Sequence, residues 1–140
     1  MKIVLDTNIL ISALIKDSFT RKIIIESGFE LFYPEISFKE IIKYKEYILE
    51  KSNYNNKEQF WKILNKLLEY INLVPIELIQ SKIKEAPNII KHIDIKDIIF
   101  IATALSINNF YIWSEDKDFE KQTVIKILKT EDLIKIFQKK

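Results

Sequence analysis

Short apolar runs alternate with longer amphipathic stretches along this chain. The runs have the length of β-strands and cover residues 2–6, 29–33, 110–113 and 124–128, with a further short strand or link at 72–75. In the stretches between them, apolar residues recur every three or four positions, which predicts helices. Strands that alternate with helices predict an α/β fold with a parallel sheet covered by helices on both faces.

The predicted helices have recognisable ends. They cover residues 8–15, 20–27, 38–51, 58–71, 76–86, 94–107 and 131–137. Gly28 is a typical helix C-cap, the polar residues 52–56 separate two helices, and Pro87 ends another. The helix at 94–107 is the most apolar, so we expect it to be the most buried.

Composition narrows the class of protein. With 140 residues, 48% of them hydrophobic and 30% charged, the chain is expected to form one globular domain over residues 1–140. One glycine and three prolines argue against a turn-rich all-β fold. Without cysteine, and with His92 as the only histidine, thiolate and multi-histidine metal sites are excluded. Any metal would have oxygen ligands, which favours Mg²⁺ or Mn²⁺ over Zn²⁺.

Net charge and hydropathy say less about the function of the chain than its composition does. A net charge of +2 is too small to indicate nucleic-acid binding by itself. The amino-terminal residues lack the pattern of a signal peptide, and no apolar window reaches the length that spans a membrane. We therefore expect a cytoplasmic protein without a membrane partner.

Several acids occupy matching places relative to the predicted elements. Asp6 and Asp116 each follow an apolar strand, Asp97 and Asp94 lie at the start of the most apolar helix, and Glu40 lies in the first turn of another. Parallel strands end at the same edge of a sheet, and the helices that follow them begin there, so these acids can face one pocket. Clustered carboxylates repel one another, and one or two divalent cations relieve the repulsion. The pattern indicates a metal site suited to phosphodiester cleavage.

Most of these acids also have an ordinary structural explanation. Glu40 can form a capping box with Ser37, and Asp94 and Asp97 can cap a helix and complement its dipole. Asp116 and Asp118 can be turn residues, and Glu115 an exposed loop acid. Asp6 is the hardest to explain in this way, although Thr7 or Asn8 could cap the helix that follows it.

Four motifs, in this order, resemble the PIN-domain nucleases, a family that includes the VapC-type ribonuclease toxins and related archaeal proteins. They are Asp6-Thr7-Asn8 after an apolar strand, Ser37-x-x-Glu40-Ile41, the segment from Asp97 to Leu105, and the segment from Trp113 to Phe119. The resemblance spans nearly the whole chain. It implies a three-layer α/β/α sandwich with a central parallel sheet, and metal-dependent hydrolysis of single-stranded or structured RNA.

The resemblance also implies roles for individual residues. Asp6, Glu40, Asp97 and Asp116 match the four acids of the family's catalytic site, and Asp118 matches a further acid of many members. Mg²⁺ or Mn²⁺ is expected on Asp6, Asp97, Asp116 and Asp118. The expected supporting residues are Thr7, Asn8, Ser114 and Asp94, of which Asp94 is either a ligand through water or a helix cap. Lys39, Lys43 and Lys117 are candidates to hold the RNA backbone. Glu115 departs from the family, which often has a small or basic residue there.

Two other functions stay open in the sequence. The chain could be a catalytically inert PIN domain that binds RNA or protein. Alternatively, Asp6 could be the nucleophile or phospho-acceptor of a Mg²⁺-dependent phosphatase or receiver domain, although such phosphatases usually have a second Asp where this chain has Asn8.

The resemblance leaves open which partners the chain has. An antitoxin protein would be the partner of a VapC-type toxin, and the RNA target cannot be read from the sequence. Because the family commonly dimerises, a homodimer is also expected. Residues Tyr47, Tyr54, Phe60 and Trp61 would supply either an apolar surface for it or part of the core.

Overall fold

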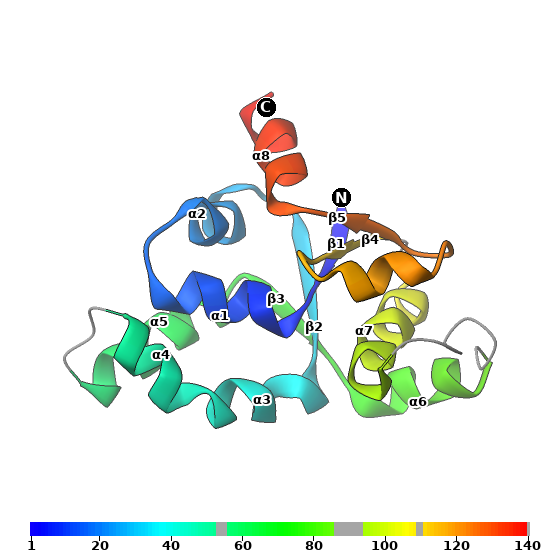
Figure 1. The fold of residues 1–140 in the computed structure, drawn as a ribbon, viewed down its shortest axis with the longest axis horizontal. Helices are drawn as coiled ribbons and strands as arrows, with labels where there is room; N and C mark the ends of the chain where they lie inside the picture. The colour runs from blue at the N-terminus through cyan, green and yellow to red at the C-terminus, as the bar shows by residue number, and fades with distance from the viewer. Residues whose placement is uncertain (53–55, 86–93, 109–110, 140) are drawn as a thin grey trace.

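The computed structural model describes residues 1–52, 56–85, 94–108 and 111–139, and its centre is one parallel sheet (Figure 1). The sheet has five strands in the order β3-β2-β1-β4-β5, and all neighbouring strands pair in parallel. The strands are β1 (Lys2–Leu5), β2 (Glu30–Pro34), β3 (Ile71–Val74), β4 (Tyr111–Trp113) and β5 (Lys126–Leu128).

Helices cover both faces of this sheet. They are α1 (Thr7–Ile15), α2 (Phe19–Glu26), α3 (Phe38–Lys43), α4 (Lys45–Lys51), α5 (Lys57–Leu68), α6 (Ile76–Glu85), α7 (Ile95–Ser106) and α8 (Thr130–Gln138), with 3₁₀ turns at η1 (Glu35–Ser37) and η2 (Lys117–Lys121). In Figure 1, α1, α2 and α5 lie on one side of the sheet, and α6 and α7 lie on the other. The predicted three-layer α/β/α sandwich is therefore confirmed.

The central strand β1 explains why the two layers of helices hold together. Its residues Ile3, Val4 and Leu5 are all fully buried, without the alternation of a strand that has one face in water. A strand covered on both faces has this continuous apolar pattern. Parallel pairing sets Val4 opposite Ile112 and Leu5 opposite Trp113, so the residues that follow both strands meet at one edge of the sheet.

Two predicted boundaries were wrong. The helix expected over residues 38–51 is divided at Tyr44, where the backbone (φ −93°, ψ 10°) leaves the helical conformation. The helix expected to end at Ile71 ends at Leu68 instead, and residues 72–75 do not form a mere link. Ile71 is buried as the first residue of β3 and pairs with Leu31, so sheet pairing overrides the helical pattern there.

Some expectations concern residues outside the described part of the chain. These are the predicted helix end at Ala86 and Pro87, the first strand residue Phe110, and the side chains of His92 and Tyr54. Phe60 is fully buried and belongs to the core, whereas Tyr47 and Trp61 are exposed. Among the described helices, none has the length and apolar character needed to cross a bilayer.

Gly28 occupies the one place where the turn after α2 needs a glycine. Its φ of +75° lies in the left-handed region, and an added Cβ would meet no atom within 4 Å.

Gly28→Ala should therefore lower the free energy of unfolding by about 1 kcal/mol through backbone strain alone. Urea denaturation measures this loss. Gly28→Asn is the control and should lose less, because asparagine tolerates this conformation better; equal losses would contradict the explanation.

Candidate active site

Asp6 is held at the carboxyl edge of the sheet by hydrogen bonds to both of its carboxylate oxygens. It is the N-cap of α1, where its Oδ1 accepts a hydrogen bond of 2.9 Å from the backbone N of Ile9. Its Oδ2 accepts a short hydrogen bond from Ser114 Oγ, which in turn accepts one of 2.9 Å from the backbone N of Asp116. Asp6, rather than Thr7 or Asn8, caps the helix. Ser114 thus ties the first strand-end acid to the second.

A second buried network joins the start of α1 to the turn before α3. The hydroxyl of Tyr33 donates a hydrogen bond of 3.0 Å to the carbonyl of Ser37 and lies 2.8 Å from Thr7 Oγ1. Since the phenol has only one proton to donate, Thr7 donates to Tyr33. Burial raises the pKa of Tyr33, so the phenol stays protonated. The sequence analysis missed this tyrosine; its signal is a hydroxyl-bearing side chain near the end of a buried strand.

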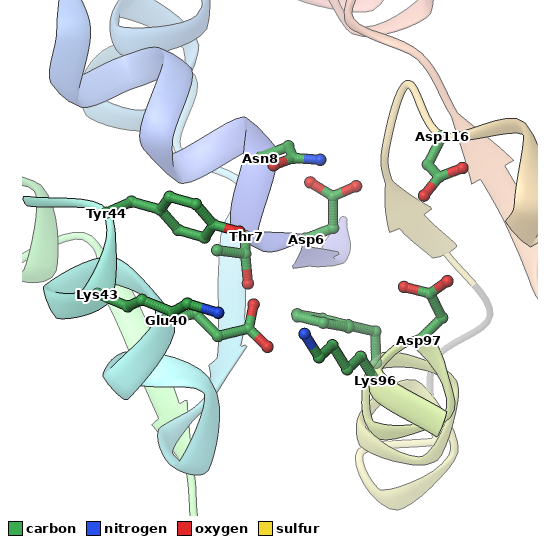
Figure 2. A pocket seen from close by; sticks show the side chains of 10 residues that line it. Asp6, Thr7, Asn8, Glu40, Lys43, Tyr44, Lys96, Asp97 and Asp116 are labelled. Atoms are coloured by element: carbon green, nitrogen blue, oxygen red, sulfur yellow. The ribbon is translucent and has the colours of Figure 1, made fainter. Parts of the chain in front are cut away.

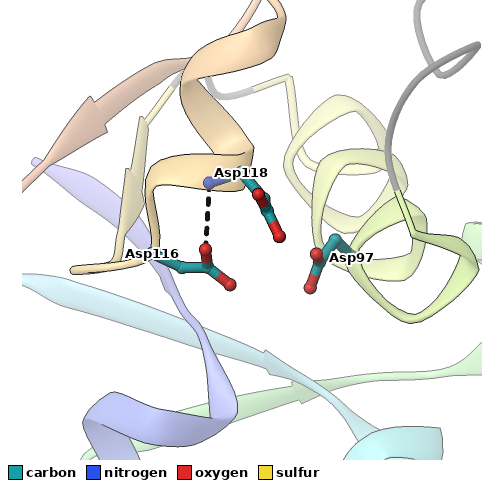
Figure 3. A group of neighbouring side chains, drawn as sticks. All are labelled: Asp97, Asp116 and Asp118. Carbon is teal, nitrogen blue, oxygen red and sulfur yellow. Dashed lines mark hydrogen bonds between the residues drawn. The ribbon is translucent and has the colours of Figure 1, made fainter.

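Three aspartates, Asp97, Asp116 and Asp118, form a tight group (Figure 3). Each of Asp97, Asp116 and Asp118 has one carboxylate oxygen that lies within 4.8 Å of those of the other two. The backbone N of Asp118 donates to Asp116 Oδ1 over 2.9 Å, which sets the geometry of the turn. Asp118 also forms an exposed salt bridge of 3.4 Å with Lys121. The all-oxygen donor set suits a hard divalent cation.

Asp6, Asp97 and Asp116 line one side of a small hollow at the edge of the sheet, and Asp118 is not among its lining residues (Figure 2). Its volume is about 170 Å³, and Glu40 reaches it from α3, across from Asp97 and Asp116. The lining residues are Asp6, Thr7, Asn8, Glu40, Lys43, Tyr44, Lys96, Asp97, Phe100 and Asp116. Within the part of the chain that the structure describes, no ion pair joins a lysine or arginine to Asp6, Asp97 or Asp116.

The structure brings together most of the residues that the sequence indicated. All four expected catalytic acids line the hollow, as do Thr7, Asn8 and Lys43, while Ser114 lies directly behind Asp6. Lys39 and Lys117 are exposed and do not line it. The sequence analysis missed Lys96, Tyr44 and Phe100, whose positions depend on how α3 and α7 face each other.

The ordinary explanations of the acids can now be separated. The capping box of Ser37 and Glu40 was wrong: Ser37 has a helical backbone (φ −81°, ψ −4°) rather than the extended one of an N-cap, and its side chain makes no cap hydrogen bond. Asp94 is exposed and caps α7 by accepting from the backbone N of Lys96 over 3.1 Å. Glu115 is exposed as expected and accepts from the backbone N of Thr130 over 2.7 Å, at the start of α8.

Burial and mutual repulsion make two of these acids weaker than usual. Burial raises the pKa of Asp6 from 3.8 to about 6, although the hydrogen bonds from Ser114 and Ile9 oppose the shift. Burial also raises the pKa of Asp97 to about 6, with the charges of Asp116, Asp94 and Asp118 adding to it. The hollow therefore holds negative charge at neutral pH at a cost in folding free energy.

This fold and edge geometry agree with comparisons to known proteins. The sequence profile of the PIN domain family matches residues 4–136. The chain belongs to the PIN-domain family. Membership indicates nuclease activity. No curated protein matches the chain in sequence.

Solved structures with this PIN fold include three VapBC proteins. A chain of VapBC2 from Rickettsia felis, bound to a DNA fragment from its promoter, has a TM-score of 0.68 at 15% identity, covering 92% of this chain and 98% of that one. DNA-bound VapBC from Salmonella typhimurium has a TM-score of 0.65 at 15% identity, covering 93% of this chain and 98% of that one. VapBC-1 from nontypeable Haemophilus influenzae has a TM-score of 0.65 at 26% identity, covering 94% of this chain and 99% of that one.

The raised pKa of Asp97 predicts that removing its charge stabilises the metal-free protein. A carboxyl whose pKa rises from 3.8 to about 6 on folding binds its proton more tightly in the folded state, so it weakens the fold as pH rises through that range. Asp97 is only half-buried and solvent screens it, so we expect Asp97→Asn to gain about 1 kcal/mol, or about 3 °C in melting temperature, at pH 8 in EDTA.

The gain should largely vanish at about pH 3, where the wild-type carboxyl is mostly protonated in both the folded and the unfolded state. Thermal unfolding at the two pH values measures it. The control is Glu50→Gln, which removes an exposed acid on α4, away from the hollow. A melting temperature of Asp97→Asn that is lower than the wild type's at pH 8 would show that the carboxylate stabilises the fold instead.

Proposed function

We propose that this PIN-domain protein is a metal-dependent endoribonuclease that hydrolyses RNA phosphodiester bonds. The convergence of Asp6, Glu40, Asp97 and Asp116 on one hollow carries the proposal, because these acids come from four separate segments of the chain. The raised pKa values of Asp6 and Asp97, in a hollow where neither forms an ion pair with a described lysine or arginine, are typical of functional sites rather than of structural acids. The family resemblance supports RNA as the substrate.

Asp6, Asp97 and Asp116, together with Asp118, would hold Mg²⁺ or Mn²⁺. When bound, such a metal lowers the pKa of a coordinated water and offsets the charge that develops on the phosphate. The oxygen-only donor set favours these two ions over softer metals.

The other residues of the hollow have distinct tasks in hydrolysis. Ser114 and the backbone N–H of Ile9 orient the carboxylate of Asp6, so the acid keeps one geometry throughout the reaction. Glu40, which faces the aspartates from α3, binds and orients the attacking water. Lys43 and Lys96 attract the phosphate and balance part of its charge. In the reaction water forms a P–O bond and releases one proton to solvent, and the P–O bond to the ribose oxygen of the leaving strand breaks as that oxygen takes up a proton.

The competing functions have less support. An inert binding domain would not need all four acids to line one hollow at a cost in stability. For a phosphatase or receiver domain, Asp6 would have to attack phosphorus, yet both of its oxygens accept hydrogen bonds and Asn8 replaces the second aspartate. Both observations favour a ligand role for Asp6 over a nucleophilic one.

The proposed partners follow from the relatives. Because the structural neighbours are VapBC proteins, we propose an antitoxin protein as a partner, encoded beside this chain. A homodimer is proposed from the family resemblance alone.

The nuclease proposal predicts Mn²⁺-dependent cleavage that requires Asp6. Purified wild-type protein should cleave a labelled RNA in Mn²⁺ or Mg²⁺ and stop in EDTA. Asp6→Asn should lose at least about 100-fold in rate, since the substitution removes a charged metal ligand while keeping the shape of the side chain. Gel-resolved cleavage over time measures both effects.

The matched control is Asp17→Asn, an exposed aspartate after α1 that should keep full activity. A single-stranded DNA of the same sequence tests the preference for RNA. Equal cleavage by wild type and Asp6→Asn would overturn the assignment, as would cleavage that persists in EDTA.

The partner proposal predicts a toxin's behaviour in cells. Expression of the wild type should arrest growth, and Asp6→Asn should not, because arrest depends on RNA cleavage. Co-expression of the small protein encoded beside this chain should restore growth and co-purify with it. Arrest by both variants would point to a cause other than the nuclease, and growth that is not restored would exclude that neighbour as the antitoxin.

A further inference from the structure

A second cavity adjoins the acidic hollow and shares two of its residues. It is a groove of about 420 Å³ between α1 and the α3–α4 segment, within the range of about 300–1,000 Å³ that is typical of ligand sites. We call it the tyrosine groove. Its lining residues are Asn8, Ile11, Ser12, Ile15, Lys16, Tyr44 and Tyr47. Asn8 and Tyr44 also line the acidic hollow, so a bound polymer can pass from one cavity to the other.

Two tyrosine rings are presented to solvent in this groove. Tyr44 is 41% exposed and Tyr47 48%, so neither ring is enclosed by the core. The same segment is anchored by Ile41 and Ile48, which are fully buried. The helix break at Tyr44 places this ring between the two cavities. The segment is therefore held by its isoleucines, and its tyrosines are free to contact a ligand.

Positive charge accompanies both rings. The ammonium of Lys43 lies 5.7 Å from the centre of the Tyr44 ring, and that of Lys51 lies 5.9 Å from the centre of the Tyr47 ring. Lys16 lines the groove on the side of α1. Aromatic rings that bases stack on, next to lysines that attract phosphates, are the combination that binds single-stranded nucleic acid.

We propose that the tyrosine groove binds the nucleotide next to the scissile phosphate, with its base stacked on Tyr44 and Tyr47. Lys16 and Lys43 hold the flanking phosphates. A base that is paired and stacked within a duplex cannot reach these rings, so the substrate must be unpaired at this position. The inference rests on the proposed nuclease function, because it uses the acidic hollow as the place of cleavage.

Substitution of the two tyrosines tests the proposal by separating binding from chemistry. Tyr44→Ala and Tyr47→Ala should each raise KM for a single-stranded RNA about 10-fold and leave kcat within about 2-fold, because stacking binds the substrate without contacting the reacting atoms. Tyr44→Phe keeps the ring and should match the wild type. Melting temperatures establish that the variants are folded.

Tyr70→Ala is the matched control. Tyr70 is also 41% exposed, but it precedes β3 and therefore lies at the opposite edge of the parallel sheet from the hollow. Its substitution should change neither KM nor kcat. An equal rise in KM for Tyr70→Ala would mean that any exposed tyrosine contributes, which would overturn a specific site.

Substrates that lack a single base locate the site. A series of oligoribonucleotides, each with one abasic residue, should show a rise in KM at one position adjacent to the cleaved bond. That penalty should disappear in Tyr44→Ala, because this variant has no ring at position 44 for the base to stack on. Duplex RNA of the same sequence should be cleaved at least about 10-fold more slowly than the single strand.

Binding measurements distinguish failure of the groove from failure of the nuclease. Fluorescence anisotropy with the same labelled RNA in Ca²⁺ should show weaker binding by Tyr44→Ala and Tyr47→Ala, whether or not cleavage occurs. Wild-type cleavage with unchanged KM in both variants would overturn the groove and leave the nuclease. RNA binding that depends on the tyrosines without any Mn²⁺-dependent cleavage would support the groove and overturn the nuclease. A change of mass in sedimentation for Tyr47→Ala would show that a second copy of the chain occupies the groove instead.

Discussion

The parallel register between β1 and β4 is the constraint on which the site depends. Pairing of Leu5 with Trp113 sets the next residues, Asp6 and Ser114, side by side at the carboxyl edge. The backbone N of Asp6 continues the ladder by donating to the carbonyl of Trp113 over 3.2 Å. Ser114 then bonds Asp6 and receives the backbone N of Asp116, so one hydroxyl sets the distance between two acids that lie far apart in the sequence. A one-residue slip of β1 would turn Asp6 to the other face of the sheet and away from Ser114.

The acids at this edge weaken the fold that holds them. Asp6 is only 4% exposed and accepts two hydrogen bonds, and hydrogen bonds to a charged group contribute about 1.5–3 kcal/mol each. Burial still raises its pKa to about 6, so the local dipoles do not offset the loss of solvation. Uncharged residues that keep the hydrogen bonds of these acids would make the carboxyl edge of the sheet more stable. Stability is supplied by the apolar strands and by α7, and the edge is free to serve a ligand.

The sequence predicted what short-range patterns determine and missed what depends on long-range packing. The alternation of strands and helices indicated the fold, and Asp6 and Asp116 were visible because each follows an apolar run. Ser37 and Glu40 fit a local capping pattern, but the 3₁₀ turn η1 gives Ser37 a helical backbone and the box does not form. Tyr33, Tyr44 and Lys96 join the site only through the approach of distant elements, for which no local pattern exists.

The two walls of the hollow are built under different constraints. The acidic wall consists of strand ends and the first turn of α7. Asp6 both lines the hollow and caps α1, so a substitution of Asp6 disturbs the ligand site and the fold together. The opposite wall is anchored by buried Ile41 and Ile48, and its exposed residues, among them Lys43 and Tyr44, add little to the core. Exposed substitutions usually change stability by less than about 0.5 kcal/mol. With Glu40 kept, the exposed residues of the α3–α4 wall can therefore vary while the acidic wall is retained, which is how one fold can serve nucleases of different specificity.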